Sequence, residues 1–187
     1  MLSGEKVNLR ALELTDLDNC LSWINDREVT RFLTMGLWPV SRKSEEEWLT
    51  NAASGRDPAN KGFAIETKDE VYLGGIGLHR IDLVSGTAEL GIVIGRKDYW
   101  GRGYGTDAAK TLLKHAFANL RLRKVILTVL GSNARAQKTY AKLGFKAVGC
   151  LKAHSLKEGQ FEDLVYMEVF ADEFETVCKK IEQASSA

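Results

Sequence analysis

The sequence predicts one α/β domain with a mixed sheet. Runs with the composition of strands alternate with amphipathic helix patterns, and turn residues separate them. The chain has 187 residues, which suits one domain, and it contains no internal repeat or long linker. We therefore expect a single domain over residues 1–170, with residues 171–187 as its C-terminal helix and frayed tail.

The N-terminal part is expected to hold one strand and two helices. Residues 7–12 alternate like a half-buried strand. The first helix is expected to open with a capping box of Thr15 and Asp18, and the second with Ser44 as its cap and Glu47 three residues later. The segment between these helices is apolar and irregular.

The centre of the chain has the pattern of a sheet followed by a helix. Runs at 62–67, 72–82 and 87–95 are strand-like and closely spaced, which predicts antiparallel neighbours. A helix is expected from about residue 106 to residue 119. Its core face is predicted to contain Ala108, Ala109, Leu112, Leu113, Ala116 and Phe117.

The C-terminal part continues the alternation. Residues 124–130 form an apolar strand of the buried type. Residues 132–144 form the expected helix, which begins at a Ser-Asn pair and stops at a glycine. Two strands at about 145–154 and 161–170 and a charged helix complete the chain.

Composition excludes several classes of protein. The formal net charge of +1 gives no field that would attract nucleic acid directly. The three cysteines are scattered, which is typical of free thiols in a reducing compartment. No apolar run has the length of a signal peptide or of a membrane span. These features predict a cytoplasmic protein without a membrane segment.

The stretch "DYWGRGYGTDAAK" (98–110) is the main candidate for a binding site. Gly101, Gly103 and Gly105 lack a Cβ atom, so their backbone can bend sharply and approach a ligand closely. The stretch leads from a strand to a helix N-terminus, where free N–H groups and the helix dipole favour an anion, and Arg102 adds a positive charge. The loop chemistry indicates a phosphate or pyrophosphate, and a glycine-rich turn without a ligand is an equally open alternative.

Two familiar nucleotide-binding loops do not match. A P-loop requires Gly-Lys-Ser/Thr, which is missing. A dinucleotide fingerprint requires glycine where Thr106 stands and an acid at the end of the next strand, which ends "TVLGSN".

Two signatures together carry a family resemblance. Residues 100–105, Trp-Gly-Arg-Gly-Tyr-Gly, are similar to the pattern Arg/Gln-x-x-Gly-x-Gly/Ala, with Trp100 at the first position. Residues 133–145 are similar to Asn-x-x-Ala/Ser-x-x-x-Tyr-x-Lys-x-Gly-Phe. Over residues 7–170 the chain resembles the GNAT superfamily of acetyl-CoA-dependent N-acetyltransferases, most of all the branch of ribosomal-protein and spermidine N-acetyltransferases.

The resemblance implies a fold and a cofactor site. The fold is a mixed, mostly antiparallel sheet of about seven strands with helices on both faces and a splayed central strand, where Gly91 allows a bulge. The cofactor is acetyl-CoA, with its pantetheine arm along that strand and its pyrophosphate in the glycine-rich loop. Cofactor contacts are expected from Ile92, Val93, Ile94, Trp100, Gly101, Arg102, Gly103, Tyr104, Gly105, Thr106, Asn133, Ala136 and Tyr140.

The resemblance also implies direct attack of an amine on the thioester. Glu89 is the candidate general base, acting directly or through water, and the alternative is a solvated glutamate. Tyr140 is the candidate acid for the leaving thiolate, and the alternative is an ordinary core aromatic. Asn133, Ala136 and Tyr140 are spaced so that they share one helix face.

Other polar residues receive structural interpretations. His79, His115 and His154 are isolated, without metal-ligand spacing, and are interpreted as core or surface residues, with His115 exposed on a helix. Four basic residues are interpreted as surface charge, one of which contacts the adenosine phosphate. These are Arg96, Lys97, Arg135 and Lys138.

The acceptor amine is the least determined feature. In this family its wall is formed by segments that correspond here to 26–47 and 150–161. The first contains acids that would attract a polyamine or stabilise helix N-termini, and apolar residues that include Met35 and Leu37. We expect a protein N-terminus or a small primary amine. A polyamine, amino sugar or aminoglycoside acceptor, a non-catalytic coenzyme A-binding regulatory module, and a homodimer stay open.

Overall fold

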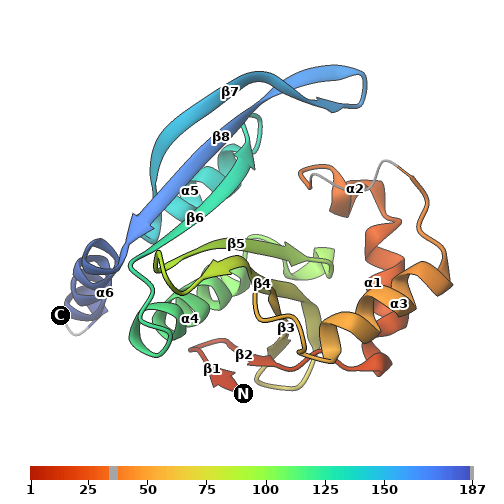
Figure 1. Ribbon diagram of the computed structural model, residues 1–187, viewed down its shortest axis with the longest axis horizontal. Coiled ribbons are helices and arrows are strands. Elements are labelled where there is room, and N and C mark those ends of the chain that lie inside the picture. The colour runs from red at the N-terminus through yellow and green to blue at the C-terminus, as the bar shows by residue number, and fades with distance from the viewer. Residues whose placement is uncertain (34–37, 186–187) are drawn as a thin grey trace.

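The structure is a computed structural model that describes residues 1–33 and 38–185 (Figure 1). Met35, Leu37 and the end of the expected frayed tail lie outside the described residues. Within them, eight strands form one sheet. They are β1 (Leu2–Ser3), β2 (Val7–Arg10), β3 (Lys61–Thr67), β4 (Tyr72–Asp82), β5 (Thr87–Ile94), β6 (Lys124–Leu130), β7 (Lys146–Lys157) and β8 (Gln160–Phe170).

The sheet is mixed and mostly antiparallel, as predicted. Its order is β1–β2–β3–β4–β5–β6–β8–β7, and only β5 and β6 are parallel among the strands of the described chain. The expectation of about seven strands missed β1, because its two residues are too few to show an alternating pattern. The last two strands were expected to be shorter, and they form a long hairpin whose turn contains Glu158 and Gly159.

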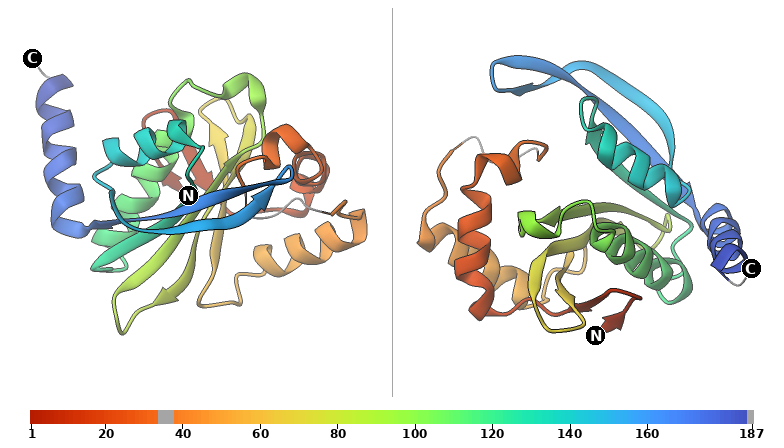
Figure 2. Two further views of the ribbon diagram at one scale, coloured as in Figure 1. Left: turned by 90° about the horizontal axis from the view of Figure 1, so that it is seen from above. Right: turned by 180° about the vertical axis from the view of Figure 1, so that it is seen from behind.

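Helices cover both faces of the sheet, as expected (Figures 1 and 2). The helices are α1 (Leu17–Ile24), α2 (Arg27–Thr30), α3 (Arg42–Ala53), α4 (Tyr104–Ala118), α5 (Ala134–Lys142) and α6 (Ala171–Ser185), with 3-10 turns η1 (Leu14–Asp16) and η2 (Lys97–Tyr99). The apolar face of α4 packs against the centre of the sheet, and the residues predicted for it are buried except Phe117, which is partly buried. On the opposite face, Leu17 of α1 and Leu49 of α3 pack against Ala64 of β3.

Two helix starts differ from the prediction. Asp16, rather than Asp18, accepts a hydrogen bond at the first start, from the backbone N of Glu13 at 2.9 Å, because a 3-10 turn precedes α1. Helix α3 is capped by Ser41, whose hydroxyl accepts from the backbone N of Ser44 at 3.2 Å. Ser44 therefore donates its backbone N–H to the capping residue and is not the capping residue itself.

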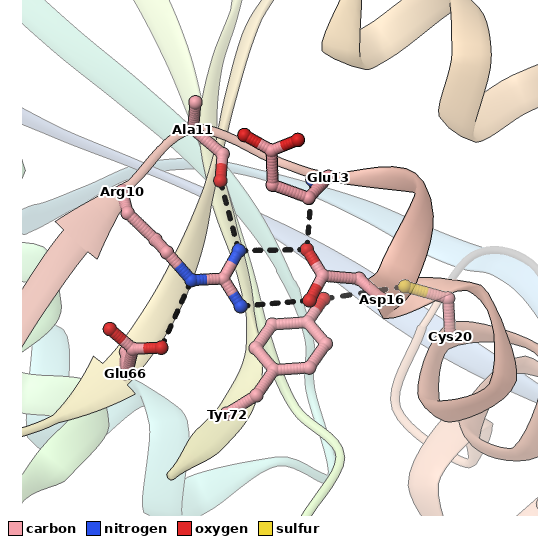
Figure 3. Close-up of polar contacts among 7 residues, drawn as sticks. All are labelled: Arg10, Ala11, Glu13, Asp16, Cys20, Glu66 and Tyr72. Carbon is pink, nitrogen blue, oxygen red and sulfur yellow. Dashed lines mark hydrogen bonds and ion pairs between the residues drawn. The ribbon is translucent and has the colours of Figure 1, made fainter. Parts of the chain in front are cut away.

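A polar cluster joins η1 to the sheet (Figure 3). The guanidinium of Arg10 on β2 donates to both carboxylate oxygens of Asp16 at 2.8 Å, and its Nε donates to Glu66 of β3 at 3.0 Å. Asp16 is buried. Beside it, Cys20 Sγ lies 3.3 Å from the hydroxyl of Tyr72, and burial raises the pKa of both groups. This cluster fixes the start of α1 on the sheet.

Candidate active site

A gap opens beside β5 at the centre of the sheet. The parallel ladder with β6 joins only Thr87–Glu89 to Lys124–Ile126, although β5 continues to Ile94. Strand β6 stays paired with β8 as far as Leu130 and diverges from β5 (Figure 1). The expected splayed central strand is therefore confirmed.

Gly91 does not form the expected bulge. It pairs with Gly77 of β4 in a regular register, and the irregularity of that ladder lies between His79 and Asp82. A Cβ atom at Gly91 would lie 3.1 Å from Nε2 of His79. The glycine makes room for the imidazole, and the splay arises because β6 follows β8 instead of β5.

The free edge of β5 presents selected backbone groups to the gap. The backbone N of Gly95 donates to Leu73 of β4 at 2.8 Å. Because peptide groups alternate in direction along a strand, those of Val93 also face β4, and those of Ile92 and Ile94 face the gap. The indole N–H of Trp100 donates to the carbonyl of Ile94 at 2.7 Å. Of the backbone groups expected to contact the pantetheine arm, three therefore face the gap without a partner there among the described residues. These are the N–H and the carbonyl of Ile92 and the N–H of Ile94.

The glycine-rich loop brings backbone amides to the N-terminus of α4. Gly101 and Gly103 have φ angles of +74° and +86°, which glycine adopts without steric cost. The helix begins at Tyr104 rather than at Thr106, and the amide of Asp107 donates to Gly103 at 3.0 Å. The amides that precede Asp107 point out of the helix end, where the dipole favours a negative charge.

Positive charge surrounds this loop from two sides. Arg102 is exposed within it, and Arg135 of α5 lies over the indole of Trp100 at 5.2 Å. Lys6 Nζ donates to the backbone carbonyl of Arg102 at 3.0 Å. No local pattern indicated Lys6 as a neighbour of the loop, because it lies 96 residues before Arg102.

Asp107 explains how Lys6 reaches the loop. Its carboxylate, buried near the start of α4, accepts from the backbone N of Glu5 at 3.2 Å, of Lys6 at 2.7 Å and of Val7 at 3.0 Å. These bonds fasten the turn between β1 and β2 to the helix. The carboxylate of Asp107 therefore points at the β1–β2 connection.

Helix α5 carries the second signature. It begins at Ala134, and Asn133 is its cap, because the side-chain Oδ1 accepts from the backbone N of Ala136 at 3.1 Å. Gly144, with a φ angle of +94°, follows the helix as expected. The capping bond occupies Oδ1 of Asn133.

Tyr140 is packed against the core. Its ring lies at 5.8 Å from that of Phe145 in an edge-to-face arrangement. Burial raises the pKa of Tyr140 to about 12, so the phenol keeps its proton at neutral pH. The core contact and the protonated phenol occur together, so the two interpretations of this residue are compatible.

Glu89 lies at the closed end of the gap. It is the last residue of β5 that pairs with β6, and it lies opposite His79 of β4. Its Oε2 accepts from Nη1 of Arg80 at 2.6 Å, and the side chains of Glu89 and Arg80 are 18% and 83% exposed. The carboxylate is therefore one partner of an ion pair rather than a solvated glutamate.

Some of the acidic residues of the first acceptor segment already form ion pairs within the protein. Lys97 Nζ lies 2.9 Å from Asp26 and 2.8 Å from Glu28, so a residue interpreted as solvated charge links η2 to α2. Beside Lys97, Arg96 pairs at 3.0 Å with Asp98, an acid outside this segment. Glu45 is buried on α3, and burial raises the pKa of its carboxyl. Asp26, Glu28 and Glu45 are therefore paired or buried, whereas Glu46 and Glu47 are exposed on α3.

The second acceptor segment is the hairpin of β7 and β8. Its turn lies on the side of the molecule that carries α1 and α2 in all views (Figures 1 and 2). Leu156 and Phe161 near the turn are exposed. This hairpin therefore brings apolar side chains towards the side where the first acceptor segment lies.

Other expectations concern absences and histidines. His115 is half-buried on α4 rather than exposed, and His154 is exposed on β7. Within the described residues no group of His, Cys, Asp and Glu is suited to a metal ion, and no disulfide joins cysteines. Over the same part of the chain, no helix combines the length and the apolarity that crossing a membrane requires.

Comparisons with known proteins agree with this geometry. The model of the acetyltransferase (GNAT) domain matches residues 6–146. This chain belongs to that family, and the expected class, an acetyl-CoA-dependent N-acetyltransferase, is confirmed.

Individual relatives and solved structures show which members of the family the chain is similar to. The spermidine N(1)-acetyltransferase of Escherichia coli (strain K12) is 29% identical over 174 residues, which cover 93% of this chain and 91% of that protein. The uncharacterized N-acetyltransferase p20 of Bacillus licheniformis is 29% identical over 167 residues, 89% of this chain and 93% of that one. A crystal structure of the Vibrio cholerae spermidine N-acetyltransferase in complex with CoA and spermine superposes with a TM-score of 0.83 at 25% identity, over 90% of this chain and 97% of that one.

Proposed function

We propose that this enzyme transfers the acetyl group of acetyl-CoA to a small primary amine by direct attack, with Glu89 as general base and Tyr140 as general acid. The observation that carries the proposal is the gap beside β5, which ends at Glu89 and lies next to the helix N-terminus of the glycine-rich loop. A polyamine is the first acceptor to test, because relatives in this branch are spermidine N-acetyltransferases. A protein N-terminus is the second.

The cofactor would lie along the free edge of β5. The amides before Asp107, with Lys6 and Arg102, would hold the pyrophosphate. The peptide groups of Ile92 and Ile94 that face the gap would pair with the pantetheine arm. Acetyl-CoA supplies the thioester, and the amide of Ile92 is available to donate to the carbonyl oxygen as negative charge develops on it.

The residues would then move protons. The amine nitrogen bonds to the thioester carbon, the C–S bond breaks, and its electron pair leaves with sulfur. Glu89 accepts a proton from the attacking nitrogen. Tyr140 gives a proton to the thiolate, and the apolar surroundings that raise its pKa also disfavour a thiolate beside it.

The test is acetyl-CoA-dependent thiol release with spermidine, spermine, amino sugars, aminoglycosides and peptides with free N-termini. We expect turnover with polyamines, and we expect Glu89→Gln to lower kcat by roughly 10²-fold or more while CoA affinity is retained. The matched control is Glu175→Gln on α6. The side chain of Glu175 is 66% exposed, and it pairs with Lys179 and with no described residue of the candidate site.

Three results would contradict parts of this proposal. Binding of CoA without turnover of any amine would indicate a regulatory module. Preference for a dinucleotide or a nucleoside triphosphate over CoA would exclude the assigned loop function. A normal rate and pH profile for Glu89→Gln would remove Glu89 from the mechanism.

A further inference from the structure

The imidazole of His79 lies over two glycines at the edge of the gap. Gly77 on β4 and Gly91 on β5 are directly opposite each other. A Cβ atom added at Gly77 would lie 3.4 Å from Nε2 of His79, and one at Gly91 would lie 3.1 Å from Nε2 and 3.2 Å from Cδ2. The ring therefore covers the strand position just before Ile92, whose peptide groups face the gap.

A hydrogen-bond chain fixes the tautomer of this ring. Nδ1 of His79 lies 3.2 Å from Oδ1 of Asn60, and Nδ2 of Asn60 donates to Asp57 at 2.7 Å. Since Asn60 donates to a carboxylate through its nitrogen, its oxygen faces the ring and accepts from Nδ1–H. Hydrogen bonding to Asn60 lowers the pKa of Asp57, so this carboxylate stays ionised. Nε2 of the neutral imidazole then carries the free electron pair.

The ring lies on the face of the sheet from which an amine would arrive. Leu78 and Leu90 are opposite each other and are buried against α4. His79 and Glu89 are the next residues along the two strands in their ladder, so they face the other side. That side carries α1 and α3, the helices on either side of the first acceptor segment, and His79 is exposed there.

Arg80 shows that this corner is built under strain. It has a φ angle of +49°, a left-handed conformation that costs an arginine on the order of 1 kcal/mol, and it lies at the irregularity of the β4–β5 ladder. In a regular strand Arg80 and His79 would face opposite sides. The strained backbone instead lets Arg80 pair with Glu89 on the face of His79.

We propose that His79 is a further catalytic residue, which deprotonates the incoming ammonium at Nε2 before attack, while Asn60 and Asp57 position its ring. This inference rests on the proposed function. The charged and polar groups around the ring are Glu89 on β5, Arg80 on β4, and Asn60 with Asp57 before β3.

The protons balance with two acceptors. The ammonium gives its first proton to Nε2 of His79, which releases it to solvent. After the C–N bond forms, the nitrogen gives a second proton to Glu89. Tyr140 protonates the departing thiolate. The proton held by Glu89 is then lost and one proton returns to Tyr140, so that both residues are reset. One proton is released for each amide and thiol formed.

The chemistry of the two side chains favours this division. The reference pKa of an imidazole is about two units higher than that of a glutamate carboxyl group. Transfer of a proton from an alkylammonium to the imidazole is therefore roughly 10²-fold less unfavourable than transfer to the carboxylate. The nitrogen of the tetrahedral adduct is far more acidic than an alkylammonium, so a carboxylate suffices for the second transfer.

The test compares acceptors in wild-type enzyme and His79→Gln. With spermidine at pH 7 we expect the variant to lose roughly 10²-fold in kcat/KM. With methoxyamine or an aniline, which are already neutral at pH 7, we expect a loss of less than about threefold. In His79→Ala, added imidazole should restore part of the rate with spermidine. The matched control is His115→Gln near the C-terminal end of α4, outside both acceptor segments and away from the glycine-rich loop.

The outcomes separate this inference from the proposed function. If wild-type enzyme turns over no amine, the proposed function fails. If wild-type enzyme is active and His79→Gln loses the same factor with charged and neutral acceptors, the ring only positions the substrate and the inference is overturned. An unchanged rate for His79→Gln overturns it as well. Melting temperature and CoA affinity, measured for each variant, identify any loss that comes from misfolding.

Discussion

Burial decides the chemistry available to Tyr140. The ring packs against Phe145 at 5.8 Å, and burial raises the pKa of the phenol to about 12. In the unfolded chain a phenol titrates near pH 10. This difference stabilises the fold fully below about pH 10, and the contribution is lost as the pH rises through about 12. Throughout the neutral range the phenol is protonated and able to donate.

Removing only the hydroxyl of Tyr140 tests its role. We expect Tyr140→Phe to lower kcat by roughly 10²-fold, because the ring is kept and the proton donor is lost. Steady-state kinetics with the best acceptor and a titration with CoA measure the two quantities. The melting temperature should stay close to the wild-type value. An unchanged kcat would show that Tyr140 is a core aromatic and nothing more.

At the scale of elements, the loop before α4 depends on one backbone conformation. Gly103 precedes the helix and has a φ angle of +86°, so any side chain there would strain the backbone. Space is not the reason, because an added Cβ atom would lie 3.5 Å from its nearest neighbour, Lys6 Nζ. Gly105 is helical, and a Cβ atom would make ordinary contacts of 3.6 Å with Ile94 and 3.7 Å with Ile92. The two glycines therefore differ in what they tolerate.

Alanine at each glycine separates conformation from volume. We expect Gly103→Ala to weaken CoA binding about tenfold, because the left-handed conformation costs alanine about 1–2 kcal/mol and a backbone that relaxes out of it turns the amides away. We expect Gly105→Ala to bind CoA within about twofold of wild type, because alanine is the better helix former. Calorimetric titration with CoA measures both. Equal losses in the two variants would contradict the assigned anion site.

At the scale of the whole molecule, the cluster of Arg10, Asp16 and Glu66 joins the N-terminal segment to a strand that is distant in sequence (Figure 3). The bidentate contact at 2.8 Å links β2 to the start of α1, and Glu66 adds β3. Asp16 raises the pKa of Arg10, whose side chain is about a quarter exposed. The guanidinium remains charged whether or not its partner is present.

Removing the carboxylate of Asp16 should therefore destabilise the fold. We expect Asp16→Ala to lower the free energy of unfolding by about 2–3 kcal/mol, below the 3–5 kcal/mol typical of a fully buried pair because Glu66 remains. Urea denaturation measures the loss. The control is Asp18→Ala, whose side chain is 79% exposed and pairs with Arg42, and we expect less than about 1 kcal/mol there. Equal losses would mean that burial does not set the strength of these pairs.

Local patterns predicted most of the elements and part of the site. The strand at 124–130 is observed at the predicted bounds, and the buried face of α4 follows the predicted residues. Errors fell where a pattern is too short or ambiguous. Ser41 and Ser44 are both plausible caps by spacing, and β1 has two residues. Periodicity over a few residues cannot distinguish such alternatives.

The sequence by itself determined the order of elements, the glycine-rich loop, the signature of α5 and, through them, the family. These are local features, because hydrophobic period, capping residues and glycine conformation act over a few neighbouring residues. Only the tertiary structure decided that Lys6 lies at the loop, that Gly91 makes room for His79, and that Glu89 pairs with Arg80. Strand register and packing bring together side chains that are distant in sequence, and no local pattern specifies which ones will meet.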